Sequence, residues 1–498
     1  MMREIITLQL GNLSNYTATH FWNVQESYFT YDDQSSSPID HNILWRAGLG
    51  HDGCETFMPR TVIYDLKGAF GSLRKINTLY DAMPQVDAAA AADRLSLWSG
   101  SPTVHKQPAV DPGPYQQSLN AGLEPAQLTA SVVRHWSDFS RVYFHPKSLV
   151  QLYDYELDST IRPFDRFAMG VDLFDSLAKE HDVLDRDWRP FAEECDNMQG
   201  IQVVTSLDDA WAGFASSYLE ALRDEFPKSS IWVWPLQTPQ PPCSPGTRQM
   251  RLLNTAYFLN QACSSASAIM PLTVPDEDCI PPEFSIDRSS LWSASGLLSA
   301  AMETATLPSR RTSEFVPLSD MAECLSNGRS RRLVKTGISL GHQALEPDAN
   351  PLDLSPSYPS RKRARGDFRR ERIFGQLFTS RGRAEDAKLN VHVPEQQQSP
   401  LADDNPVTRR YAFPLPFPLL SSFPRLHGQS RTNSADIPVQ TVLSTDTSIA
   451  TRLKSLRAQV CPSVPVAERE DVGNGLLDIV EAYQDGWLSD SDEGDDDI

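Results

Sequence analysis

The feature that most constrains the fold is a strand, a tight turn and a helix at the start of the chain. Residues 5–10 (IITLQL) alternate with the period of two that is typical of a strand, and Gly11 follows them. From Asn15 onward, the large apolar residues Phe21, Trp22 and Tyr28 recur at helical spacing. In parallel α/β folds, this is the turn that offers helix N–H groups to a phosphate. The pattern predicts an open α/β sheet with a candidate anion site at its first turn.

The same alternation of strands and helices continues to about residue 304. Strands that alternate with helices of this length favour a doubly wound, mostly parallel sheet flanked by helices. After about residue 310, proline, serine and charged residues dominate, so we also expect disordered insertions and a divergent C-terminal region. The predicted strands are 61–66, 201–205 and 231–234, and the predicted helices are 166–180, 188–195, 211–226, 248–262 and 291–304.

Composition excludes several classes of protein. A formal net charge of −20 argues against a general nucleic-acid binder, so we expect no direct contact with nucleic acid. The seven cysteines form no CxxC pair, which favours a reducing compartment over a disulfide framework or a zinc ribbon. No apolar run reaches the roughly 18–20 residues that span a bilayer, so we expect no transmembrane segment.

Four pieces of the chain resemble tubulin in the order in which tubulin has them. Residues 2–22 look like its first strand, turn and helix, where the tubulin turn reads GQCGNQIG, and residues 57–74 resemble the approach to its second strand. Residues 194–213 resemble the strand that leads into the glycine-rich loop, and residues 291–308 resemble the helix that opens the intermediate region. The stretch WSDFSRVYFHPKSL (136–149) is closer still to the Misato family, tubulin-like proteins of mitochondrial inheritance. The resemblance covers about residues 1–310.

The resemblance locates a nucleotide site that this sequence has altered. Tubulin packs backbone N–H groups around the phosphates with GGGTGSG, whereas the matching residues here read DDAWAG. Two negative charges about 4 Å apart repel by roughly 4 kcal/mol at an effective dielectric of about 20, and Trp211 would enter the space of a phosphate. We therefore expect no cofactor, with bound GTP as the alternative. The degenerate nucleotide site is interpreted as Gly11, Asn12, Asn15, Asp208, Asp209 and Gly213.

Other interpretations of the same residues stay open. Asp208 and Asp209 could cap the helix predicted at 211–226 or hold a divalent metal, and Trp211 suits the core. No HExxH or GxSxG motif is present, so we expect no catalytic residue and no metal site. Tubulin's hydrolysis between subunits needs an acid near the start of the helix at 291–304, where the first acid here is Glu303. The resemblance therefore implies no GTPase activity.

Two charged runs lie in the last third of the chain. The run 360–372 (SRKRARGDFRRER) suits a nuclear import signal, a contact with anionic lipid or a solvated stretch. The run 486–498 ends in DSDEGDDDI, and such acidic runs are usually solvated. The basic cluster consists of Arg361, Lys362, Arg363, Arg365, Arg369, Arg370 and Arg372.

Composition and the resemblance together divide the chain into seven parts. The apolar, proline-rich residues 411–426 read as a docking edge within the sixth part. The parts are a tubulin-like N-terminal segment (1–98), a Pro/Gly-rich linker (99–129), a tubulin-like core segment (130–310), a connecting region (311–344), a disordered basic insert (345–410), a C-terminal region (411–485) and an acidic tail (486–498).

Membership of the Misato family would imply a role in the partitioning of mitochondria and the inheritance of mitochondrial DNA. We expect a non-catalytic adaptor that binds proteins on mitochondria or the cytoskeleton and makes, at most, peripheral contact with an anionic membrane. The expected location is the cytosolic face of mitochondria, and also the cytoplasm. Two alternatives stay open, a divergent GTP-binding switch and a nuclear or cytoskeletal assembly factor.

Overall fold

The computed structural model describes most of the chain. It describes residues 3–30, 37–49, 55–73, 110–239, 243–280, 286–341, 344, 350–358, 371–382, 406–425 and 436–484. Among these residues, no helix is both long enough and apolar enough to cross a membrane.

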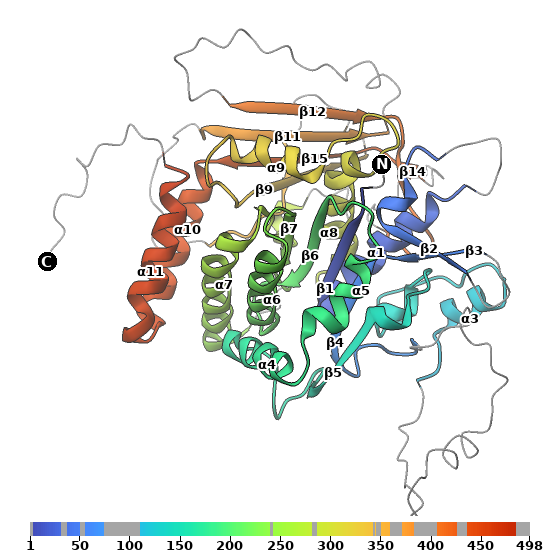
Figure 1. Cartoon of the computed structure of the whole chain (residues 1–498), viewed down its shortest axis with the longest axis horizontal. Coiled ribbons are helices and arrows are strands. Elements are labelled where there is room, and N and C mark those ends of the chain that lie inside the picture. Colours follow the sequence, from blue (N-terminus) through green and yellow to red (C-terminus); the bar gives the residue numbers. More distant parts are fainter. Residues whose placement is uncertain are drawn as a thin grey trace, which may run out of the picture.

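A six-stranded parallel sheet forms the centre of the first half of the chain (Figure 1). Its strand order is β5-β4-β1-β6-β7-β8, so the connections run outward in both directions from β1 and β6. This reversal of direction is the topological switch point, where open α/β sheets bind their ligands. The strands are β1 (Ile5–Leu10), β4 (Thr61–Lys67), β5 (Leu149–Glu156), β6 (Gly200–Ser206), β7 (Ser230–Leu236) and β8 (Ala268–Ile269).

Helices cover both faces of this sheet, which confirms the predicted doubly wound fold. Alternate residues of β1 enter the two cores: Ile5 joins the core on one face, and Ile6 and Leu8 join the core on the other. The first core is closed by α1 (Asn12–Ser27) and α8 (Leu291–Thr306). The second core is closed by α4 (Phe167–Glu180), α6 (Trp211–Glu225) and α7 (Pro245–Ser265).

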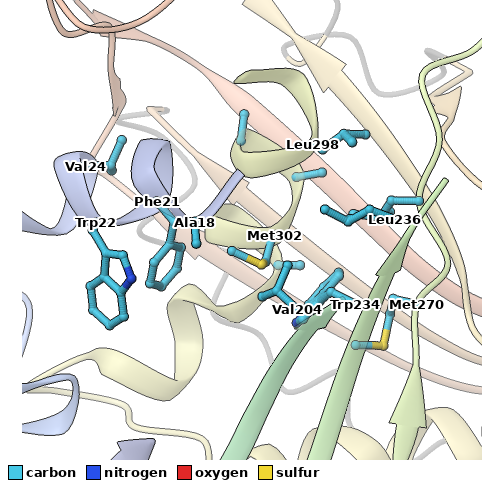
Figure 2. Packing of buried hydrophobic residues seen from close by; sticks show 14 of the residues in the cluster. Ala18, Phe21, Trp22, Val24, Val204, Trp234, Leu236, Met270, Leu298 and Met302 are labelled. Atoms are coloured by element: carbon cyan, nitrogen blue, oxygen red, sulfur yellow. The ribbon is translucent and has the colours of Figure 1, made fainter. Parts of the chain in front are cut away.

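A second sheet of five strands packs against α8. Its order is β10-β9-β15-β11-β12, with β11 and β12 parallel and the other pairs antiparallel. Figure 2 shows Leu298 and Met302 in the core that α8 shares with α1 and the parallel sheet. The strands are β9 (Lys335–Leu340), β10 (Leu352–Asp353), β11 (Ile373–Arg381), β12 (Val407–Phe413) and β15 (Val439–Asp446).

Shorter elements complete the structure. α9 (Leu318–Ser326) packs on the second sheet, and α10 (Ser448–Val460) and α11 (Val466–Glu481) pack on α7. The remaining elements include α3 (Pro114–Asn120), α5 (Arg189–Ala192), the hairpin of β2 (Trp45–Leu49) and β3 (Glu55–Pro59), and the pair β13 (Phe417–Pro418) and β14 (Asp436–Ile437).

Three expectations about the irregular regions need correction. Part of the predicted disordered insert is ordered, because residues 373–381 form the strand β11 between β15 and β12. Part of the predicted linker is the helix α3, whose Tyr115 is buried. The predicted docking edge at 411–426 instead contributes buried Phe417 and Phe423 to the core. Residues 359–370 and 383–405 of the predicted insert lie outside the described residues, as do residues 485–498 at the end of the chain.

A buried charge network joins α1 and α8 to the second sheet. Glu303 of α8 is 2.9 Å from Arg310 and also pairs with Arg381 of β11, and all three side chains are fully buried. The Tyr28 hydroxyl donates to Glu303 at 3.0 Å and accepts from Arg381 at 2.8 Å. Arg381 also donates to the carbonyl of Pro416 at 2.6 Å. Glu303 therefore holds the end of α1, the end of α8 and the second sheet together.

Two glycines let α4 and α6 cross in close contact. A Cβ atom on Gly213 of α6 would lie 2.0 Å from the carbonyl oxygen of Phe167, and one on Gly170 of α4 would lie 1.8 Å from that of Ala210. Both obstacles are backbone atoms, which cannot rotate away. Any larger side chain must therefore push the two helices apart.

The variant Glu303→Gln should lower the free energy of unfolding by about 3–5 kcal/mol, because two buried arginines lose their counter-charge. Urea unfolding measures this change. The matched control is Glu314→Gln, since the Glu314 side chain is 57% exposed and pairs with Arg311 at 3.5 Å. The control should stay within about 0.5 kcal/mol of wild type. Equal changes in the free energy of unfolding for the two variants would show that the buried pairs of Glu303 do not stabilise the structure.

The variant Gly213→Ala should lower the free energy of unfolding by about 2–3 kcal/mol through overpacking. Gly246→Ala is its control, because a Cβ there would meet nothing closer than the Ser244 hydroxyl at 3.8 Å. In that first turn of α7, alanine should be neutral or stabilise by up to about 1 kcal/mol. Thermal and urea unfolding of both variants would test the contact, and an unchanged Gly213→Ala would contradict it.

Candidate functional site

The candidate site lies at the carboxyl ends of β1 and β6, at the switch point of the parallel sheet. The structure brings Gly11, Asn12 and Asn15 together there at the start of α1, with Asp208 and Asp209 in the loop between β6 and α6. Gly11 has a φ of 90°, in the region that favours glycine, and its N–H donates to the carbonyl of Tyr64 at 3.1 Å. The backbone of the first turn is therefore shaped for close approach by another group.

The group that approaches Gly11 is the indole of Trp211. A Cβ atom on Gly11 would lie 2.5 Å from Trp211 Cδ1 and 2.6 Å from Nε1. Trp211 is 3% exposed and packs edge-on against Phe164 and Phe214, with ring centroids 5.4 and 5.5 Å away. A side chain of this protein thus occupies the space over the turn, where a bound phosphate would need open access to N–H groups.

The two loop carboxylates are engaged by the protein itself. Asp208 Oδ1 accepts from the Thr238 hydroxyl at 2.9 Å, and Asp208 Oδ2 lies 3.8 Å from Arg251 Nε. Asp209 Oδ1 accepts from the backbone N–H of Trp211 at 2.8 Å, and Asp209 directly precedes Ala210, the N-cap residue of α6. Burial raises the pKa of both carboxyls; that of Asp209 rises to about 7, with the charge of Asp208 as a further cause. Neither aspartate is the N-cap residue of α6, which is Ala210, but Asp209 binds the first N–H of that helix.

Asn15 is held by a third carboxylate, Asp65, near the end of β4. Asn15 Nδ2 donates to Asp65 Oδ2 at 2.7 Å and to the Tyr64 carbonyl at 3.3 Å. Asp65 is fully buried, and this burial raises the pKa of its carboxyl to about 7. The sequence interpretation omitted Asp65. A signal was present, because its carboxyl group lies at the carboxyl end of a predicted parallel strand, beside the first turn.

Gly213 and the basic cluster do not belong to this corner. Gly213 lies inside α6, where it serves the helix contact with Phe167, and it does not form a phosphate loop. Arg372 precedes β11, and its N–H donates to Thr447 at 3.1 Å; the other six residues of the basic cluster lie outside the described residues. Thr238 and Arg251 bind Asp208 but were not predicted, because each is distant from it in the sequence.

The chemistry of the corner follows from these contacts. Around the turn lie the buried carboxyls of Asp65 and Asp208 and the half-buried carboxyl of Asp209, where a phosphate needs donors. Within the described ranges, no three His, Cys, Asp or Glu side chains lie close enough together to hold a metal ion. Glu303, the first acid of α8, is fully buried in its pair of arginines and does not face solvent. The protein's own side chains therefore fill this corner at the carboxyl ends of β1 and β6.

Comparisons with known proteins agree with this fold. A family model described as a tubulin domain matches residues 125–311, and one described as the Misato Segment II tubulin-like domain matches residues 3–121. The chain is 52% identical to Protein DML1 of Gibberella zeae and 42% identical to Protein dml-1 of Neurospora crassa, over all of both chains in each case. It is 40% identical to Protein dml1 of Aspergillus niger, over 99% of this chain and all of that one. The chain therefore belongs to the Misato family of tubulin-like proteins, together with the fungal proteins named DML1.

Proposed function

We propose that this chain is a non-catalytic tubulin-like protein that acts as an adaptor in the partitioning of mitochondria and the inheritance of mitochondrial DNA. The cellular role is the one that resemblance to the Misato family implies. The observation that carries the non-catalytic part is the Trp211 indole packed over Gly11. A ligand that placed phosphate in this corner would have to displace a side chain that is 3% exposed.

The polar groups of the corner support the same proposal. The amide of Asn15 donates to Asp65, and the N–H that begins α6 donates to Asp209. These two donors are therefore already used within the protein and are not offered to a phosphate. The buried position of Glu303 supports the absence of a hydrolytic acid supplied to a neighbouring subunit.

An adaptor needs a surface that partners can reach, and the outer edge of the parallel sheet offers one. Among the residues that the structure describes, β5 is the outermost strand of that sheet and pairs with β4 alone. Tyr153 on β5 is 75% exposed, and Ile161 in the following turn is 96% exposed. Exposed apolar side chains beside an unpaired strand edge are features of protein-binding surfaces. We propose this edge as a contact for protein partners on mitochondria or the cytoskeleton.

Complementation of cells that lack the chain tests the proposal. Asn12→Ala alters the half-buried first residue of α1 in the corner, and Tyr153→Asp with Ile161→Asp alters the sheet edge. We expect Asn12→Ala to restore normal mitochondrial distribution and retention of mitochondrial DNA, whereas the double variant should restore neither. Fluorescence microscopy of mitochondria and the fraction of daughter cells that retain mitochondrial DNA give the readouts.

Val466→Asp is the matched control for the surface variant, because Val466 is an isolated apolar residue on α11 that is 79% exposed. It should complement fully, and immunoblots should show equal levels of all variants. If Asn12→Ala failed as completely as loss of the chain, while present at a normal level, the GTP-binding switch would replace the adaptor proposal.

A further inference from the structure

A large cavity lies between the parallel sheet and the second sheet, and its lining residues Gln237 and Leu252 adjoin Thr238 and Arg251, which bind Asp208 of the corner. Its volume is about 1320 Å³. One wall is the connection from β8 to α8, including residues 273–279 and 286–289, and another is residues 350–358, around β10. The start of α7 and Gln459 of α10 complete the lining. The cavity is large enough for several long side chains.

The wall between β8 and α8 is acidic. It carries Asp276, Glu277 and Asp287, and its Arg288 is paired with Asp276 at 2.9 Å. Glu277 and Asp287 make no ion pair among the described residues, although Asp287 accepts from Ser289. The wall around β10 adds Asp353, which is neutralised by Arg452. Two carboxylates of the lining are therefore available to a cationic group, although the lining also contains the guanidinium of Arg248, for which the described residues provide no ion pair either.

A basic segment of this same chain leaves and returns at the rim of the cavity. Tyr358 lines the cavity and directly precedes residues 359–370. At the far end of that segment, Glu371 lies 3.3 Å from Lys335, which lies 4.0 Å from Asp353 of the lining. The twelve residues between these ends contain six basic residues, of the cluster defined above, and one acidic residue, Asp367. A loop fixed at both ends can reach about six residues, or roughly 20 Å, from the rim.

We propose that this cavity is the docking site of the chain's own basic segment, residues 359–370. Arginine side chains form charge-assisted hydrogen bonds with carboxylates, and Glu277 and Asp287 supply these acceptors. Because both ends of the segment are fixed at the rim, its local concentration is in the millimolar range even before any contact forms. While docked, the segment is withheld from other anionic partners, such as an acidic membrane or an import receptor. The proposal does not depend on the proposed cellular function.

Cleavage by trypsin within residues 361–370 of the full chain measures how often the segment is undocked. The double variant Glu277→Gln with Asp287→Asn should be cut roughly twofold to tenfold faster than wild type, the range expected for the loss of two exposed ion pairs. Wild type should approach that rate in about 0.5 M salt. The matched control replaces Glu470 and Asp471, exposed acids on α11, by Gln and Asn and should be cut like wild type. Mass spectrometry of the first fragments locates the cuts.

Binding in trans separates docking from a change in protease access. The probe is a fluorescent peptide of residues 359–370, and the receptor is the full chain with those residues replaced by a Gly/Ser linker of equal length. Anisotropy should show salt-sensitive binding that Glu277→Gln with Asp287→Asn weakens roughly twofold to tenfold and that the α11 pair leaves unchanged. Equal tryptic rates in all variants would overturn the proposal. Equal weakening by both pairs of substitutions would also overturn it, because attraction to net charge would then explain the binding.

Discussion

The corner between β1 and β6 depends on the contact between the Trp211 indole and the Gly11 turn. The space over a left-handed glycine can hold a ligand or a side chain, but not both, and here the side chain is present. The neighbouring carboxylates are also bound within the protein, since Asp209 accepts from the N–H of Trp211 and Asp208 accepts from Thr238, which follows β7. The close crossing of α4 over α6 at Gly213 then fixes the position of the tryptophan.

A second interaction is the buried charge network around Glu303, which lies near the end of α8. Glu303 lies between Arg310 and Arg381 and connects α8 to the second sheet. Burial of three charges is costly unless each is paired and hydrogen-bonded, and Tyr28 and Gln25 supply the further hydrogen bonds. Both features are consistent with a tubulin scaffold whose remaining roles are carried by its surfaces.

The sequence predicted those parts of the fold that have a strong local period. β1, β4, β6 and β7 and the long helices α1, α6, α7 and α8 were predicted close to their observed positions. β11 was missed because its nine residues follow an arginine-rich run whose composition suggested disorder. At the site, the resemblance to tubulin sufficed to connect Gly11, Asn15 and Trp211. Asp65 was missed because it meets Asn15 across 50 residues, and Gly213 was misinterpreted because its packing partner, Phe167, belongs to another helix.

Calorimetric titration of the full chain with GTP and with GDP, in the presence of magnesium, tests the central claim most directly. The filled corner predicts no heat of binding for either nucleotide, up to millimolar concentration. Asn15→Ala would behave the same way, since Asn15 binds Asp65 in this structure. Micromolar or tighter binding by wild type, weakened by Asn15→Ala, would contradict the account, because Trp211 would then have to leave the turn and admit a phosphate.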